Sequence, residues 1–264
     1  MTAPTNYGWF HILFLFLVIG ASVLFCVKFK KCSDLLLRRI IFIFWAVMVA
    51  LEIYKQIIFG FGVEDGALVW DYAWYAFPFQ FCSNPLYVFP FIVFLKDGRV
   101  RDAFIGFCAF FSFFAGVAVM LYPNDVFIET VGINIQTMIH HGSQVVIGVF
   151  LAVHERRKFS KLFYLSSLIV FAALSLIAII LNVAVYHVFE YVGIDETFNM
   201  FYISPYFDCT LPVLSSVYAV VPYPVFLVMY LLGFAIVGAV VALAQYGIMK
   251  LTDKIRSRGL KTDR

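Results

Sequence analysis

The sequence predicts an all-α, polytopic membrane protein with seven transmembrane helices, its N-terminus outside and its C-terminus inside. Of the 264 residues, 63% are hydrophobic and 13% are charged, whereas soluble domains carry about 25% charged residues. The Lys and Arg residues also gather in every second connection between apolar stretches. We therefore expect residues 1–264 to form one transmembrane domain, with membrane lipids as partners and no nucleic acid.

Seven apolar stretches approach the length of about 20 residues that a helix needs to cross a bilayer. They span residues 9–29, 39–58, 77–95, 100–121, 133–153, 163–186 and 224–249. The second carries Glu52 near its end, and the third and fifth carry polar clusters. The long connection 187–223 is predicted to lie outside, as a lid or a re-entrant cover, because long connections in compact folds are often functional.

The positive charges predict the orientation, because Lys and Arg in short loops stay on the cytoplasmic side. They fall in 28–39, 96–101, 156–161 and the tail after 249, and of 19 in total only Lys55 lies on the other side. Residues 1–8 contain no Lys or Arg. The first apolar stretch therefore lacks the basic start of a cleavable signal peptide and is predicted to be a retained helix.

The third stretch begins with polar residues enclosed by prolines. Gln80, Cys82 and Asn84 lie between Pro78 and Pro85. Polar groups are costly in hydrocarbon without partners, and prolines there remove backbone donors. We expect this part of the span to face protein or a water-filled cavity, with Cys82 about two helical turns inside the outer end.

The fifth stretch presents polar residues at a similar depth. At helical spacing Gln136, His140 and Gln144 share one face, and His141 lies on an adjacent face. At 1.5 Å per residue, His140 lies roughly 10 Å and Cys82 roughly 8 Å below the outer end. We therefore expect the imidazole and the sulfur to meet. Polar residues of the second and sixth stretches, Glu52 and Asn182, reach the same half of the membrane.

These residue types suit nucleophilic catalysis. A thiol is a good nucleophile only as thiolate, and a hydrogen-bonded imidazole can take its proton and later return it. We predict Cys82 as nucleophile, with His140 or His141 as acid and base. The predicted orienting or oxyanion-binding residues are Gln80, Asn84, Gln136, Gln144, Asn182 and Glu52.

Structural roles for the same residues remain open. Cys82 can be an inert buried thiol, or it can form a disulfide with Cys209 on the oxidising side. One histidine of the pair can simply hydrogen-bond between helices, and Glu52 can pair with Lys55 at helical spacing. No metal and no cofactor is expected, because adjacent histidines point about 100° apart on a helix and rarely bind one ion.

Four short motifs resemble those of the YwaF-type bacterial membrane proteins. They are F-P-x-Q-x-C at 77–82, I-H-H-G at 139–142, F-N-M-F-Y-I-S-P at 198–205 and V-P-Y-P at 221–224. Animal relatives of that family are transmembrane acyltransferases that make ether phospholipids with a Cys and a His. The resemblance covers roughly residues 70–250 and implies Cys82 as nucleophile and His140 as the better match to the histidine. Many bacterial members have a His where this chain has Gln80.

The resemblance implies a membrane-embedded acyltransferase, or an acyl hydrolase, that acts on phospholipid through an acyl-thioester on Cys82. Its partners would be phospholipid or lysophospholipid, and its location the cell membrane of a bacterium. The alternative is a transporter or lipid-binding membrane protein with a polar vestibule open to the outer face. A non-catalytic sensor or scaffold is a third possibility.

Overall fold

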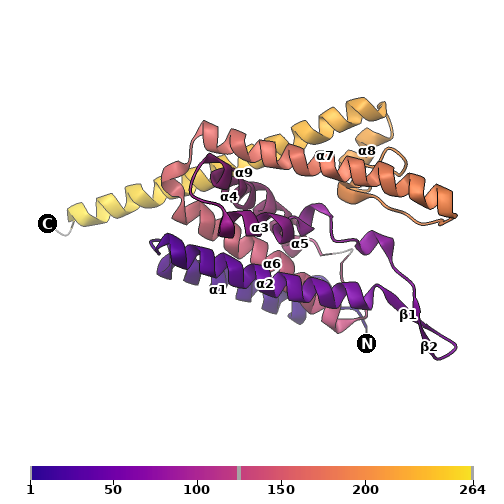
Figure 1. Ribbon diagram of the computed structural model, residues 1–264. Helices are drawn as coiled ribbons and strands as arrows, with labels where there is room; N and C mark the ends of the chain where they lie inside the picture. The colour runs from indigo at the N-terminus through magenta and orange to yellow at the C-terminus, as the bar shows by residue number, and fades with distance from the viewer. Residues whose placement is uncertain (1, 124–125, 263–264) are drawn as a thin grey trace.

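Long helices run side by side in the computed structural model, which describes residues 2–123 and 126–262 (Figure 1). The helices are α1 (Trp9–Lys28), α2 (Asp34–Ile58), α3 (Pro85–Phe94), α4 (Arg99–Phe107), α5 (Phe113–Leu121), α6 (Val131–His154), α7 (Lys161–Val192), α8 (Leu214–Tyr218) and α9 (Tyr223–Thr262). A π-helical turn, η3 (Cys108–Ser112), joins α4 and α5. A helical bundle of this kind agrees with the predicted class.

Four helical segments among the described residues are long and apolar enough to cross a membrane. They are α1, the continuous helix Arg99–Leu121, α7 and the part of α9 up to Ile255. Helices α2 and α6 have a similar length but carry more polar residues, and α3 has only ten residues. The chain is therefore an integral membrane protein, and the more polar helix α6 is largely buried in it.

A short β-hairpin departs from the all-α prediction. Strands β1 (Phe61–Glu64) and β2 (Ala67–Trp70) pair antiparallel after the end of α2. Asp65 and Gly66 connect them with φ of 49° and 79°. Left-handed conformations at both central residues define the two-residue turn whose twist suits a hairpin, and Asp-Gly is one of its preferred sequences.

The sequence predicts a helix from residue 77, but the third apolar stretch does not begin as a helix. Residues 77–80 are irregular, a 3₁₀ turn, η2 (Phe81–Ser83), follows, and α3 starts only at Pro85. Proline suits the first helical position, because its ring fixes φ and its missing N–H would have no partner there. Cys82 therefore lies on a turn before the helix, and not two turns inside it.

The sixth span is longer than expected and the connection after it is shorter. Helix α7 continues to Val192 and ends at Gly193, whose φ of 74° gives the left-handed helix end that glycine favours. The connection therefore comprises residues 193–222. Its central part, including Phe198, Phe201 and Ser204, is buried. The connection therefore packs against the rest of the protein, and its role as a lid or a re-entrant cover stays a prediction.

The bundle has two ends that we name by their contents. The hairpin end holds the start of α1, the β1–β2 hairpin and the connection 193–222, and the tail end holds the loops 29–33, 95–98 and 155–160 and the last turns of α9. Figure 1 shows the hairpin and the end of α9 on opposite sides of the molecule. Helix α6 contacts α1, α2 and α5 between these ends. A Cβ added at Gly116 of α5 would lie 2.7 Å from the carbonyl of His141, so glycine permits this close approach to α6.

Candidate functional site

Two side chains of α6 hold the turn that contains Cys82. The backbone carbonyl of Cys82 lies 3.0 Å from Nε2 of His140 and accepts a hydrogen bond of 2.9 Å from Nε2 of Gln144. Ser112, on the π-helical turn η3, donates to the other end of the Gln144 amide at 3.3 Å. The Cys82 turn is thus joined to α6 and, through Gln144, to η3. π-Helical turns occur frequently at functional sites, but the sequence analysis did not single out Ser112.

The expected meeting of Cys82 and His140 occurs at the backbone of Cys82. Within the described chain, the hydrogen bonds of His140 include one to this carbonyl and none to the Cys82 sulfur. A catalytic contact between sulfur and imidazole therefore stays a prediction. Cys82 and Cys209 are both free thiols, so the disulfide considered as an alternative is not formed in this structure.

The hydrogen bonds of the two histidines determine which nitrogen carries the proton. A carbonyl only accepts, so His140 must donate from Nε2 and its neutral ring keeps the lone pair on Nδ1. By the same argument His141 donates from Nδ1 to the carbonyl of Thr137 at 2.8 Å and keeps the lone pair on Nε2. Both of these basic nitrogens are buried without a partner in the described chain. The two rings lie 5.3 Å apart, so two free proton acceptors sit beside the Cys82 turn.

Asn84 adds a third polar group that lacks partners. Its side chain is fully buried, and neither its oxygen nor its nitrogen has a hydrogen bond within the part of the chain that the structure describes. Burying an amide without partners costs about 1–3 kcal/mol by protein mutational data. Unsatisfied buried polar groups are rare in native proteins and need an explanation. A bound substrate would supply one, since Asn84 lies two residues from Cys82.

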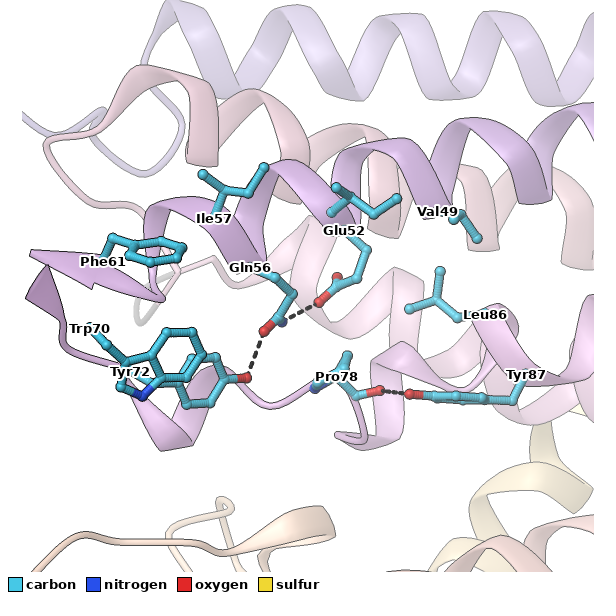
Figure 2. Close-up of a pocket in the computed structure, with 11 residues that line it drawn as sticks. Val49, Glu52, Gln56, Ile57, Phe61, Trp70, Tyr72, Pro78, Leu86 and Tyr87 are labelled. Carbon is cyan, nitrogen blue, oxygen red and sulfur yellow. Dashed lines mark hydrogen bonds between the residues drawn. The ribbon is translucent and has the colours of Figure 1, made fainter. Parts of the chain in front are cut away.

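A groove opens next to the Cys82 turn, between α2, the hairpin and residues 78–87 (Figure 2). Its volume is about 500 Å³, and its walls include Trp70, Pro78, Leu86 and Tyr87. Pro78 and Leu86 flank the turn in the chain, so the groove borders the same segment as Cys82. A predominantly apolar cleft with a few polar groups is the usual form of a ligand site.

Glu52 lies in this groove with one carboxylate oxygen free. Oε1 accepts from Lys55 at 2.8 Å and from Gln56 at 2.7 Å, as Figure 2 shows for the latter. Only 9% of the Glu52 side chain is exposed, and its buried Oε2 has no hydrogen bond in the described chain. The pairing of Glu52 with Lys55 confirms the structural role considered for it. Lys55 also interacts electrostatically with Cys82 and both histidines.

Two predicted site residues hold the connection 193–222 in place. Gln80 donates to the carbonyl of Asn199 and accepts from the amide of Phe201, both at 3.0 Å. Asn182 accepts from the amide of Met200 at 2.7 Å and donates to its carbonyl at 3.0 Å. Both amide side chains are therefore used by the backbone of the connection.

The side chains of Asn199 and Gln136 bind groups that are near them in the sequence. Asn199, which the sequence analysis did not single out, accepts from the amide of Ser204 at 2.9 Å and donates to the carbonyl of Asp208 at 3.0 Å. An Asn inside an irregular segment often bonds nearby backbone in this way, which was a signal in the sequence. Gln136 is buried and accepts from Thr137 at 3.4 Å. It lies on the same helix as His140 but, among the residues that the structure describes, has no hydrogen bond to the Cys82 turn.

These features define a helical membrane protein with an internal polar site built from the turn before α3 and the central helix α6. The chain matches the model of the TMEM164 family over residues 6–244 and belongs to this family of transmembrane proteins. The match includes the Cys82 turn, all of α6 and the connection 193–222. No curated protein and no solved structure matches the chain.

Proposed function

We propose that this protein is a membrane-embedded acyltransferase that moves a phospholipid acyl chain through a thioester on Cys82. The observation that carries the proposal is the pair of hydrogen bonds from His140 and Gln144 to the carbonyl of Cys82. The imidazole of His140, whose Nδ1 has no partner among the described residues, therefore lies next to Cys82, inside the bundle and beside the groove at Glu52. The resemblance of these motifs to those of transmembrane acyltransferases supports the same function.

The proposal includes the topology. Seven segments cross the membrane: α1, α2, α3 with the turn before it, the helix Arg99–Leu121, α6, α7 and α9. The hairpin end faces outside and the tail end faces the cytoplasm, because the basic connections belong to the tail end. Cys82 then lies in the outer half of the membrane, near the level of phospholipid ester groups. We place the protein in a cell membrane, which the resemblance suggests is bacterial.

In the first half-reaction, the Cys82 thiol gives its proton to an imidazole. The thiolate attacks the ester carbonyl of a phospholipid, the C–S bond forms, and the ester C–O bond breaks. The leaving lysophospholipid oxygen takes the proton back from the imidazolium. Nδ1 of His140 is the base that we favour, and Nε2 of His141 is the alternative. Catalytic hydrogen bonds often tighten only when substrate binds, so we expect the Cys82 sulfur and the imidazole to come into contact in the substrate complex.

In the second half-reaction, an acceptor hydroxyl loses its proton to the imidazole and attacks the thioester. The acyl chain moves to the acceptor, and the Cys82 sulfur recovers its proton. The Asn84 amide is the group that we propose to donate to the oxyanion in both steps, because its N–H bonds are buried and unused. If water replaces the acceptor, the same steps give acyl hydrolysis.

The test is to trap the thioester. Purified full-length protein is incubated with phospholipid radiolabelled in its acyl chains, and the label that stays on the protein is measured before and after hydroxylamine. We expect a hydroxylamine-labile adduct on the wild type and none on Cys82→Ala. Cys209→Ala is the matched control, because it removes another thiol at the hairpin end and should keep the adduct. His140→Ala and His141→Ala identify the base by the rate of labelling.

An adduct that survives Cys82→Ala would overturn the proposal. Absence of any adduct on the wild type, together with lipid movement in proteoliposomes that thiol blockade leaves unchanged, would instead favour the transporter or lipid-binding alternative. That alternative needs the groove at Glu52 but no reactive sulfur.

A further inference from the structure

Two further apolar cavities lie at the tail end, one on each side of the start of α7. The larger, between α4 and α7, has a volume of about 670 Å³ and includes Phe104, Ile169 and Ile177 in its lining. The smaller, between α7 and α9, has a volume of about 430 Å³ and includes Tyr164 and Leu243. Ser160, the residue that caps α7, lines both cavities. The two cavities therefore meet at the first turn of this helix.

We propose that these cavities bind the two acyl chains of an anionic phospholipid, whose phosphate lies at the start of α7. This site is distinct from the groove at Glu52, since it lies at the opposite end of the bundle and shares no lining residue with it. Its ligand is a bound lipid of the leaflet on the tail side and not the acyl donor.

The larger cavity has the dimensions of an acyl chain. It follows α7 from Ser160 to Ile177, which at 1.5 Å per residue corresponds to about 25 Å. One leaflet contributes about half of the hydrocarbon thickness of about 30 Å. The cavity is thus long enough to hold a complete chain, and its lining along α7 beyond Ser166 is entirely apolar.

Charge selects the headgroup. Arg99 lines the larger cavity and Lys161 the smaller, and both side chains are exposed without an ion pair among the described residues. Lys158 also lines the larger cavity, where Asp102 and Glu155 hold it at 2.7 and 3.0 Å. Asp102 is the one acidic residue in the lining of the two cavities, and Lys158 already binds it. The two free cations therefore remain to meet an anion.

Backbone groups add to this positive field. Helix α4 begins at Arg99, beside the same cavity, and has no side-chain cap among the described residues. At the start of α7, Ser160 caps the amide of Phe163 at 3.2 Å and leaves the amide of Leu162 uncapped. The first amides of a helix lack intrahelical acceptors, and the helix dipole favours a negative charge there. Two such helix starts beside two free cations favour a phosphate over a zwitterionic headgroup with a protruding cation.

The test compares lipids that share acyl chains and differ in headgroup. Delipidated full-length protein in detergent is titrated with phosphatidylglycerol or phosphatidylcholine, and bound lipid is counted by native mass spectrometry. We expect one phosphatidylglycerol to be retained in preference. The double variant Arg99→Gln/Lys161→Gln should weaken its binding roughly 25-fold, since each Lys or Arg near an anionic membrane surface contributes about fivefold. Arg157→Gln is the matched control, an exposed cation of the same loop that lines neither cavity.

A second variant tests the chains separately. Ala173→Trp places a large side chain in the larger cavity and should weaken phosphatidylglycerol binding while leaving the unfolding temperature without lipid unchanged. Equal retention of the two lipids, or wild-type binding by the double variant, would overturn the proposal. Displacement of the lipid by millimolar inorganic phosphate would also overturn it, because the phosphate alone would then account for binding.

Discussion

The two ends of α3 differ in how completely their polar groups are paired. At the tail end, Arg101 donates to the carbonyl of Ile92 at 2.8 Å, and Arg38 donates to the carbonyls of Val93 and Leu95 at 2.5 and 2.6 Å. These are the carbonyls that a helix leaves without partners at its C-terminus. At the hairpin end, His140 and Gln144 hold one carbonyl, that of Cys82, and the neighbouring Asn84 side chain has no partner within the described residues.

The difference separates stability from function. The guanidinium groups at the tail end also meet carboxylates: Arg101 binds Asp34 at 2.7 Å and Asp97, and Arg38 binds Asp34 at 2.6 Å. Charges that are paired in this way hold a short helix in place. Unpaired buried groups such as Asn84 and the free nitrogens of His140 and His141 cost stability. Their presence near Cys82 supports the proposal that a substrate completes their hydrogen bonds.

The largest expected effect comes from breaking the tail-end clamp. The side chain of Arg101 is 1% exposed, and Arg101→Met would leave Asp34, Asp97 and the carbonyl of Ile92 without it. Leaving the buried carbonyl of Ile92 without its donor costs about 1–3 kcal/mol. Losing the ion pairs to Asp34 and Asp97, which are 43% and 68% exposed, adds about 1 kcal/mol. We therefore expect a lower midpoint in thermal unfolding in detergent. Lys96→Met, an exposed cation in the loop before α4 that lines neither tail-end cavity, is the control and should unfold like the wild type. Equal midpoints for both variants would show that α3 does not depend on the clamp.

A smaller loss of stability is expected at the hairpin end, where the Asn182 side chain bonds the backbone of the connection 193–222. Asn182→Leu would leave the amide of Met200 buried without a partner, whereas the carbonyl of Met200 would still accept from the amide of Ile203 at 3.4 Å. The expected cost is about 1–3 kcal/mol. Ser175→Ala is the control on the same helix, because the Ser175 hydroxyl is buried and has no partner among the described residues. We expect faster proteolysis of the connection 193–222 in Asn182→Leu than in Ser175→Ala. Similar rates would mean that the connection is held by packing alone.

The regular parts of this molecule could be predicted from the sequence, because a span of apolar residues and a run of basic residues are local signals. His140 does lie beside the backbone of Cys82, but the depth predicted for Cys82 assumed a helix that begins only at Pro85, so this proximity was not predictable from the depths. The roles of Gln80 and Asn182 were not predictable, since their partners lie in the connection 193–222 and only the tertiary fold brings them together.

The start of α3 shows how a local signal was missed. The prolines at 78 and 85 argued for an interrupted span, and the helix does begin at Pro85. Counting Cys82 as part of a continuous helix was wrong, because Pro85 suits a first helical position better than an interior one. Asp65-Gly66 was a similar local signal for the hairpin.

Asn84 and Asn134 offer a matched comparison in which the same substitution should lower stability at Asn134 but not at Asn84. Both side chains are fully buried. Asn134 binds the amide and carbonyl of Ile128 at 2.9 and 2.7 Å, whereas Asn84 has no bond within the described chain. We expect Asn134→Leu to lose about 1–3 kcal/mol and Asn84→Leu to unfold at the wild-type temperature or above it. Acyl transfer should fall at least tenfold in Asn84→Leu. Loss of stability in both variants would contradict the interpretation of Asn84 as a group reserved for a ligand.

The smallest effect concerns the charge of Glu155 at the tail end. Burial raises the pKa of Glu155, but hydrogen bonds from His154 and Lys158, each at 3.0 Å, outweigh burial and hold the pKa below its ordinary value of 4.5. A lowered folded-state pKa stabilises the protein above pH 4.5, and this contribution disappears as the pH falls through the folded-state value. Glu155→Gln should therefore be less stable than the wild type by about 1 kcal/mol at pH 7, and the gap should close as the pH falls from 4.5 through the lower folded-state pKa. A stability difference of constant size over this pH range would mean that Glu155 acts through its shape and not through its charge. Paired charges would then not distinguish the stability of the tail end from that of the hairpin end.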